Sequence, residues 1–65
     1  MNSFGKNIRK YRKLKGLSQQ ELGILLGFSA RSVSDWECDN TEPNIETLRK
    51  IVEVLDISYD ELFDY

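Results

Sequence analysis

Two Ser-x-x-Glu tetrapeptides, SQQE at 18–21 and SYDE at 58–61, constrain the fold of this chain more than any other feature of its sequence. In such a capping box, the serine hydroxyl and the glutamate carboxylate bind backbone N–H groups that a helix leaves unpaired at its start. Each tetrapeptide therefore predicts the first turn of a helix. No stretch of five or more residues alternates between apolar and polar side chains, as a half-buried strand would.

Similar signals divide the rest of the chain. Ser3, Ser29 and Asn44 are suited to cap the starts of three further helices. Gly16 and Gly27 can take the left-handed conformation that often follows a helix end. We therefore expect an all-α fold of five short helices, with residues 1–65 in one domain. The first expected helix is capped by Ser3 and runs to about Lys15, the second starts at Ser18 and is ended by Gly27, and the third opens at Ser29, with Asp39 and Asn40 as plausible stops. Two more begin at 44 and 58.

Apolar side chains recur at helical spacing and define an expected core. Arg12 lies on the flank of the apolar stripe of its helix, and Glu37 lies nearer the core than the solvent. On the expected third helix, the apolar pair Val33 and Trp36 faces inward, so Arg31 points outward. The residues expected to face the core are Phe4, Ile8, Tyr11, Leu22, Leu25, Leu26, Val33, Trp36, Ile45, Leu48, Ile51, Val52, Leu55, Tyr59, Leu62 and Phe63.

The net charge of −2 conceals a strong asymmetry. Residues 1–15 carry six lysine and arginine side chains and no acid, a local charge of +6. The other fifty residues carry three cations and eleven acids, a charge of −8. Such a separation favours an anionic partner at one face, although a solvated lysine-rich helix is the alternative.

Composition disfavours several classes of function. The chain has no histidine, and its single cysteine, Cys38, cannot form an internal disulfide, which points to a reducing compartment. No catalytic set, metal-ligand cluster or glycine-rich phosphate loop is recognisable, so we expect no enzyme, no cofactor, no metal and no small-molecule ligand. No apolar run approaches the roughly 20 residues of a membrane helix, and no signal peptide is evident. We expect a cytoplasmic protein that does not enter a membrane.

The second and third expected helices are joined by a short turn that contains glycine, the pattern of a helix-turn-helix unit. Gly27 supplies the positive φ of a sharp turn, and Gly23, which has no side chain, allows the two helices to cross closely.

Two long segments, IRKYRKLKGLSQQELGILLGFSARSVSDWE and PNIETLRKIVEVLDISYDELF, resemble the phage repressor and Cro type of helix-turn-helix domain. The resemblance extends from about Ile8 to Phe63. It implies sequence-specific binding of double-stranded DNA by a transcriptional regulator, most often a repressor that acts as a dimer on a palindromic operator. The alternative is a protein-binding module that reuses the fold.

The resemblance also implies roles for individual residues, with the third helix in the major groove. Arg31 would read guanine, Asp35 could accept only from a donor such as cytosine N4, and Asp39 stands where relatives often have glycine. Ile24, which points outward, is left unassigned. The implied sets are Ala30, Arg31, Ser34 and Asp35 for bases; Ser18, Gln19, Cys38, Asn40 and Asn44 for phosphates; Arg12 with Glu37 as an ion pair; and Val54, Tyr59, Phe63 and Tyr65 for the dimer interface.

Overall fold

The computed structural model describes residues 3–64, which form five α-helices and, within that range, no β-strand. The all-α fold expected from the capping signals is confirmed. The helices are α1 (Phe4–Leu14), α2 (Gln19–Leu26), α3 (Ala30–Glu37), α4 (Ile45–Leu55) and α5 (Tyr59–Leu62).

Every helix begins at the capping residue that the sequence predicts. Ser18 Oγ accepts a hydrogen bond from the backbone N–H of Glu21 at 3.0 Å, and the Glu21 carboxylate accepts from the N–H of Ser18 at 2.9 Å. Ser58 and Glu61 repeat this box at the start of α5. Each of the other three helices begins after a single capping side chain, that of Ser3, Ser29 or Asn44.

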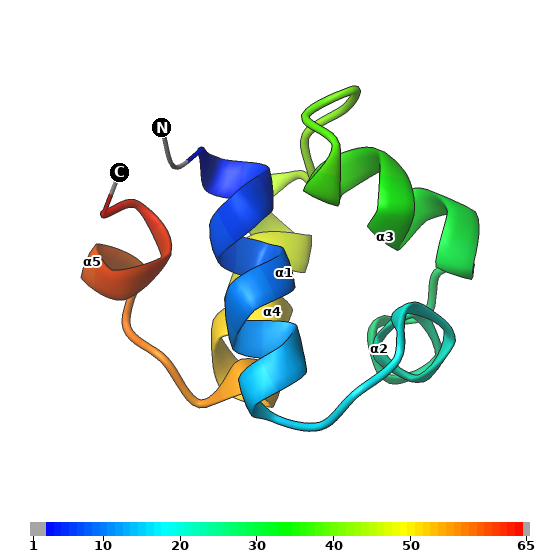
Figure 1. Ribbon diagram of the computed structural model, residues 1–65, viewed down its shortest axis with the longest axis horizontal. Helices are drawn as coiled ribbons and strands as arrows, with labels where there is room; N and C mark the ends of the chain where they lie inside the picture. The colour runs from blue at the N-terminus through cyan, green and yellow to red at the C-terminus, as the bar shows by residue number, and fades with distance from the viewer. Residues whose placement is uncertain (1–2, 65) are drawn as a thin grey trace.

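The helices surround a small core, with α2 and α3 on one side of α1 and α5 on the other (Figure 1). Asn7, a buried residue of α1, donates hydrogen bonds from Nδ2 to the backbone oxygens of Leu62 and Asp64, at 2.9 and 3.1 Å. These bonds hold the short α5 segment against α1. No helix within residues 3–64 is long and apolar enough to cross a membrane.

The corner between α2 and α3 depends on two glycines. Gly27 ends α2 with φ 81°, in the left-handed region that favours glycine. A Cβ atom on Gly23 would lie 2.6 Å from the backbone oxygen of Phe28, so a side chain there would collide with the chain entering α3. Both predictions for these glycines are confirmed.

Four of the predicted core positions are wrong. Leu25, Ile45, Tyr59 and Phe63 are between 45% and 70% exposed. Neighbouring helices cover only a narrow stripe of α2, and Ile45 lies in the first turn of α4, at the edge of the core. The single turn of α5 buries only Leu62, because one turn of helix can direct few side chains the same way. The buried apolar residues are Ile8, Leu22, Leu26, Val33, Trp36, Ile51, Val52, Leu55 and Leu62.

Candidate nucleic-acid interface

The outer face of α3 is polar and accessible, and the core anchors the helix from beneath. Val33 and Trp36 are buried. The Arg31 side chain is 88% exposed, and the other residues predicted to read bases, Ala30, Ser34 and Asp35, are half-buried. Positions one turn apart share a face of a helix, so the structure brings these four residues together on one surface.

Arg31 and Asp35 lie one turn apart on this face. Their closest charged atoms, Nε and Oδ1, are 3.9 Å apart, at the limit of an ion pair. Exposed pairs of this spacing contribute only about 0.3–0.5 kcal/mol. Arg31 is therefore held loosely, and its guanidinium can rotate toward a partner at little cost.

The start of α2 lies next to the C-terminal end of α3, because the Gln19 side chain is hydrogen-bonded to Glu37. The first backbone N–H groups of a helix have no partner within it, so the positive end of α2 offers the N–H of Gln19 to an anion. The side chains predicted to bind phosphate here already have partners: Ser18 Oγ caps the helix, and Gln19 Nε2 donates to Glu37 Oε1 at 3.1 Å. Any contact from this end therefore relies mainly on the backbone.

The loop between α3 and α4 follows Glu37, the last residue of α3. Cys38, Asn40 and Asn44 are exposed. Asn44 Oδ1 accepts a hydrogen bond from the N–H of Thr47, so the cap does not use the amide NH₂ group of Asn44. Asp39 has φ 61°, in the left-handed region that glycine adopts most readily. The predicted phosphate-binding residues therefore fall into two groups, one at the start of α2 and one between the end of α3 and the start of α4.

A buried ion pair joins α1 to α3. Arg12 donates from Nε to Glu37 Oε2 at 2.6 Å and from Nη2 to Oε1 at 3.1 Å, and the two side chains are only 9% and 3% exposed. Arg12 Nη1 also donates to the backbone oxygen of Leu17 at 2.7 Å. The ion pair implied by the family resemblance is present, and it compensates the negative charge of Glu37, the last residue of α3. The part that Gln19 plays in this network was not predicted, because its carboxamide reaches Glu37 only through the crossing of α2 and α3.

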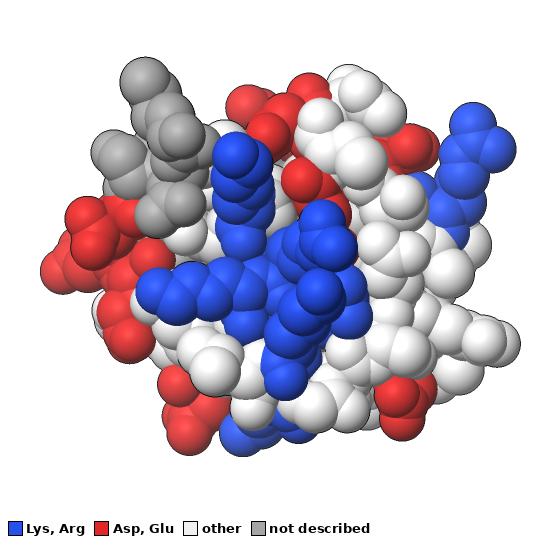
Figure 2. All heavy atoms as spheres, in the orientation of Figure 1, with Lys and Arg blue, Asp and Glu red and all other residues white. Residues whose placement is uncertain are grey.

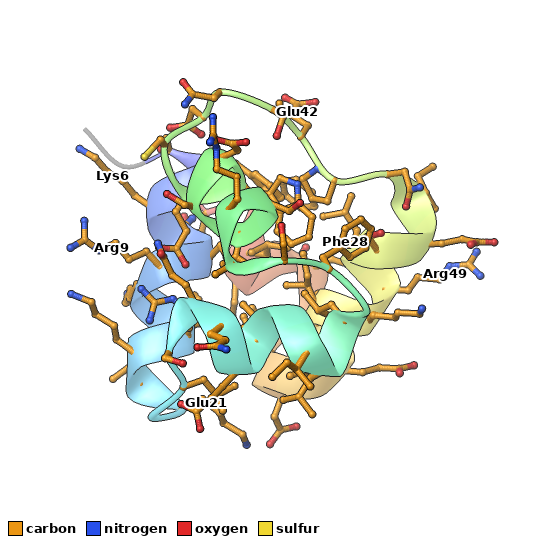
Figure 3. All side chains as sticks on the ribbon, turned by 90° about the vertical axis from the view of Figure 1, so that its right-hand side faces the viewer. Lys6, Arg9, Glu21, Phe28, Glu42 and Arg49 are labelled. Atoms are coloured by element: carbon orange, nitrogen blue, oxygen red, sulfur yellow. The ribbon has the colours of Figure 1, made fainter. Side chains whose placement is uncertain are left out.

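A cationic surface covers the exposed side of α1. Figure 2 shows lysine and arginine side chains gathered over this helix, with acidic side chains toward the edges of the view. Lys6 and Arg9 project to one side of the molecule, opposite to Arg49 of α4 (Figure 3). Because Arg12 of the same helix bonds to Glu37, and Glu37 to Gln19, this surface lies next to the start of α2 and the end of α3. Its exposed members include Arg9, Lys10 and Lys13.

Residues 8–62 match a family model described as helix-turn-helix. The chain belongs to the helix-turn-helix family. A solved structure of the P22 c2 repressor protein in complex with a synthetic operator aligns with a TM-score of 0.89 and 36% identity, covering 97% of this chain and 96% of the repressor chain.

Two curated relatives of this helix-turn-helix chain come from Bacillus subtilis (strain 168). The uncharacterized HTH-type transcriptional regulator YazB is 37% identical over 59 residues, which cover 91% of this chain and 86% of the relative. The SPbeta prophage-derived uncharacterized regulator YonR is 36% identical over 59 residues, which cover 91% of this chain and 55% of the relative. The chain thus spans only about half the length of YonR.

The residues predicted to form a dimer interface differ in how exposed they are in this helix-turn-helix fold. Val54 is half-buried, and Tyr59 and Phe63 are exposed near the C-terminal end. The Phe63 ring stacks on Phe4, with ring centroids 5.3 Å apart. Tyr65 lies outside the described residues. Within residues 3–64, no group of three or more histidine, cysteine or acidic side chains is arranged to hold a metal ion.

The capping box that opens the helix-turn-helix unit contains an ionisable group, the carboxylate of Glu21. Hydrogen bonds from the backbone N–H and the hydroxyl of Ser18 lower the pKa of Glu21 from 4.5, because they favour the ionised carboxylate. A group with a lowered pKa stabilises the fold fully above its unfolded value and loses that contribution as pH falls through its folded value. We therefore expect the stability advantage of the wild type over Glu21→Gln to shrink as pH falls below 4.5.

Thermal unfolding of both proteins between neutral pH and pH 3, followed by circular dichroism, measures this advantage. Glu53→Gln is the matched control, because Glu53 is exposed and far from any helix start. An advantage of the wild type over Glu21→Gln that stayed constant across this pH range would contradict the role of the Glu21 charge.

Proposed function

We propose that this chain is a transcriptional regulator that binds specific sequences in double-stranded DNA and acts as a repressor. The observation that carries the proposal is the outward polar face of α3, which is anchored by the buried Val33 and Trp36 and lies near two groups of residues suited to bind phosphate. The similarity to the P22 c2 repressor, which was solved with a synthetic operator, supports the choice of partner.

In this proposal α3 enters the major groove, and the four residues of its outer face, Ala30, Arg31, Ser34 and Asp35, meet base edges. Arg31 donates two hydrogen bonds to O6 and N7 of guanine. Asp35, which carries no donor when ionised, accepts from cytosine N4. Ala30 offers a methyl group to thymine, and Ser34 supplies a hydroxyl that can donate or accept.

Phosphate groups on either side of the groove hold α3 in register without reading sequence. We propose that one group of contacts comes from the start of α2, with Ser18 and Gln19. A second group comes from the segment after α3, with Cys38, Asn40 and Asn44. The cationic surface of α1 adds a field that attracts the duplex and raises its rate of association.

Two copies of the chain acting together fit an approximately palindromic operator. We propose a homodimer that pairs through Val54, Tyr59, Phe63 and Tyr65 and sets its two α3 helices about 34 Å apart, one turn of B-DNA. We further propose that the protein works in the cytoplasm by binding and not by catalysis, with no cofactor, no small-molecule ligand and no membrane partner.

The salt dependence of duplex binding tests this function. Neutralised phosphates release counterions, so the logarithm of the binding constant falls linearly with the logarithm of the salt concentration, with a slope of about −0.9 per phosphate contact. We expect the double variant Arg9→Gln/Lys13→Gln to bind more weakly and to show a shallower slope. Fluorescence anisotropy with a labelled duplex, over a range of salt concentrations, gives both quantities.

The matched control is Arg49→Gln/Lys50→Gln, which removes the same charge from exposed positions of α4. Its slope should equal that of the wild type, because Arg49 projects away from the cationic surface (Figure 3). Equal effects of the two double variants would show that only net charge matters. Absence of any duplex binding at low salt would contradict the proposed function itself.

The same measurement of duplex binding distinguishes DNA binding from the alternative function, that of a protein-binding module. Ile24 and Leu25 are 70% and 56% exposed on α2, where with Leu17 and Glu21 they line a shallow hollow. A contact made there would depend on apolar area and would respond little to salt. Ile24→Ser should therefore leave duplex binding unchanged if DNA is the partner.

A further inference from the structure

The carboxylate of Asp39, in the loop after α3, turns back onto the start of α1. Its Oδ2 accepts a hydrogen bond from Ser3 Oγ at 2.6 Å, and its Oδ1 accepts from the backbone N–H of Gly5 at 3.0 Å. Ser3 Oγ in turn accepts from the N–H of Lys6. A negative charge therefore lies at the positive end of α1 and supplies an acceptor to an N–H group that has no partner within the helix.

The ends of α1 and α3 are in close contact at this point. A Cβ atom on Gly5 would lie 2.3 Å from the backbone oxygen of Trp36, 2.7 Å from that of Glu37 and 2.8 Å from Asp39 Oδ1. Only glycine fits, and the N-terminal end of one helix meets the C-terminal carbonyl groups of the other. The point at which the chain leaves α3 is therefore fixed against α1.

The backbone of Asp39 is itself in an unfavourable conformation. Its φ of 61° lies in the left-handed region, which glycine adopts far more readily than aspartate. A residue keeps such a conformation where its surroundings hold it there. Backbone hydrogen bonds from the N–H groups of Asp39 and Asn40 to the oxygens of Trp36 and Asp35 hold this conformation, and the two side-chain bonds to the start of α1 add to that restraint.

We propose that Asp39 is a positioning residue that holds the loop of residues 38–41 against α1 and so presents Cys38 and Asn40 to the phosphate backbone. This inference rests on the proposed function and deepens it. It also explains how an acid is tolerated so near the DNA: the carboxylate is engaged by two donors and by the positive end of α1, which offsets its repulsion of phosphate.

Asp56 provides a matched control within the chain. It follows α4 with φ 55°, the same left-handed conformation, but no hydrogen bond joins its carboxylate to another residue in the range 3–64. Replacing either aspartate with glycine relieves the backbone strain equally, whereas only Asp39→Gly breaks the contact between the loop and the start of α1. Thermal unfolding of Asp39→Gly, Asp56→Gly and the wild type, followed by circular dichroism, separates the relief of strain from the loss of this contact.

We expect Asp56→Gly to keep or raise the Tm. Asp39→Gly should melt lower than Asp56→Gly by roughly 4–8 °C, the shift that about one hydrogen bond produces in a domain of this size. Asp39→Asn should recover most of this difference, because its side-chain oxygen can still accept from the N–H of Gly5. Equal Tm values for the two glycine variants would overturn the inference.

Duplex binding provides a readout that stability alone does not affect. At a temperature where every variant is folded, Asp39→Gly should bind the preferred duplex roughly two- to ten-fold more weakly, the equivalent of one hydrogen bond, with the base preference unchanged. Asp56→Gly should bind like the wild type. Unchanged affinity of Asp39→Gly would overturn the positioning role, whereas a wild-type chain that bound no duplex would instead overturn the proposed function.

Discussion

Replacing Arg12 with alanine is expected to destabilise the folded chain by about 3–5 kcal/mol, the cost of leaving a buried charge without its partner. Glu37 is only 3% exposed, and Arg12 donates two of the hydrogen bonds that its carboxylate accepts. The remaining donor, Gln19, is neutral and cannot compensate the charge. A chain of this length has a total stability of roughly 3–10 kcal/mol, so much of the variant should be unfolded at 25 °C.

Urea titration followed by circular dichroism measures the loss. Arg9→Ala is the matched control, since it removes an exposed arginine one turn earlier in α1 and should change stability by no more than about 0.5 kcal/mol. The double variant Arg12→Met/Glu37→Met should recover much of the loss, because removing both charges leaves none unpaired. Equal stability of Arg12→Ala and Arg9→Ala would contradict the importance of the pair.

Replacing Arg31 with alanine is expected to cost about 1–3 kcal/mol of discrimination at one base pair of each half-site. The side chain is 88% exposed and pairs only weakly with Asp35, so its loss should leave the fold intact. The reading of guanine by two hydrogen bonds should disappear while contacts elsewhere persist. Titration of the preferred duplex and of single-base variants of it, with wild-type and variant protein, measures the discrimination.

Arg49→Ala serves as the control, because it removes an exposed arginine from α4, away from the α3 face. It should leave the base preference unchanged. If Arg31→Ala weakened binding to every duplex equally, Arg31 would contact phosphate and would not read a base.

The helix boundaries could be predicted because the interactions that set them are local. A cap joins residues three positions apart, as in Ser18 with Glu21, and a glycine such as Gly27 determines its own turn. The outward direction of Arg31 was predictable for the same reason, because Val33 and Trp36 on the same short helix face the core.

The interactions between distant segments could not be predicted. Gln19 meets Glu37 across 18 residues, and Ser3 meets Asp39 across 36. Their distances depend on how the helices cross, which no local pattern specifies. The exposure of Leu25 and Ile45 has a similar origin, because a periodic stripe shows which residues share a face but not how far a neighbouring helix covers it.

The central claim, that the α3 face reads a DNA sequence, is tested most directly by selecting binding sites from a pool of random duplexes. The wild type should enrich one approximately palindromic sequence whose half-sites lie about 34 Å apart, each with a G·C pair that Arg31→Ala no longer selects. Failure to enrich any sequence at low ionic strength, or an identical preferred sequence for Arg31→Ala, would contradict the claim.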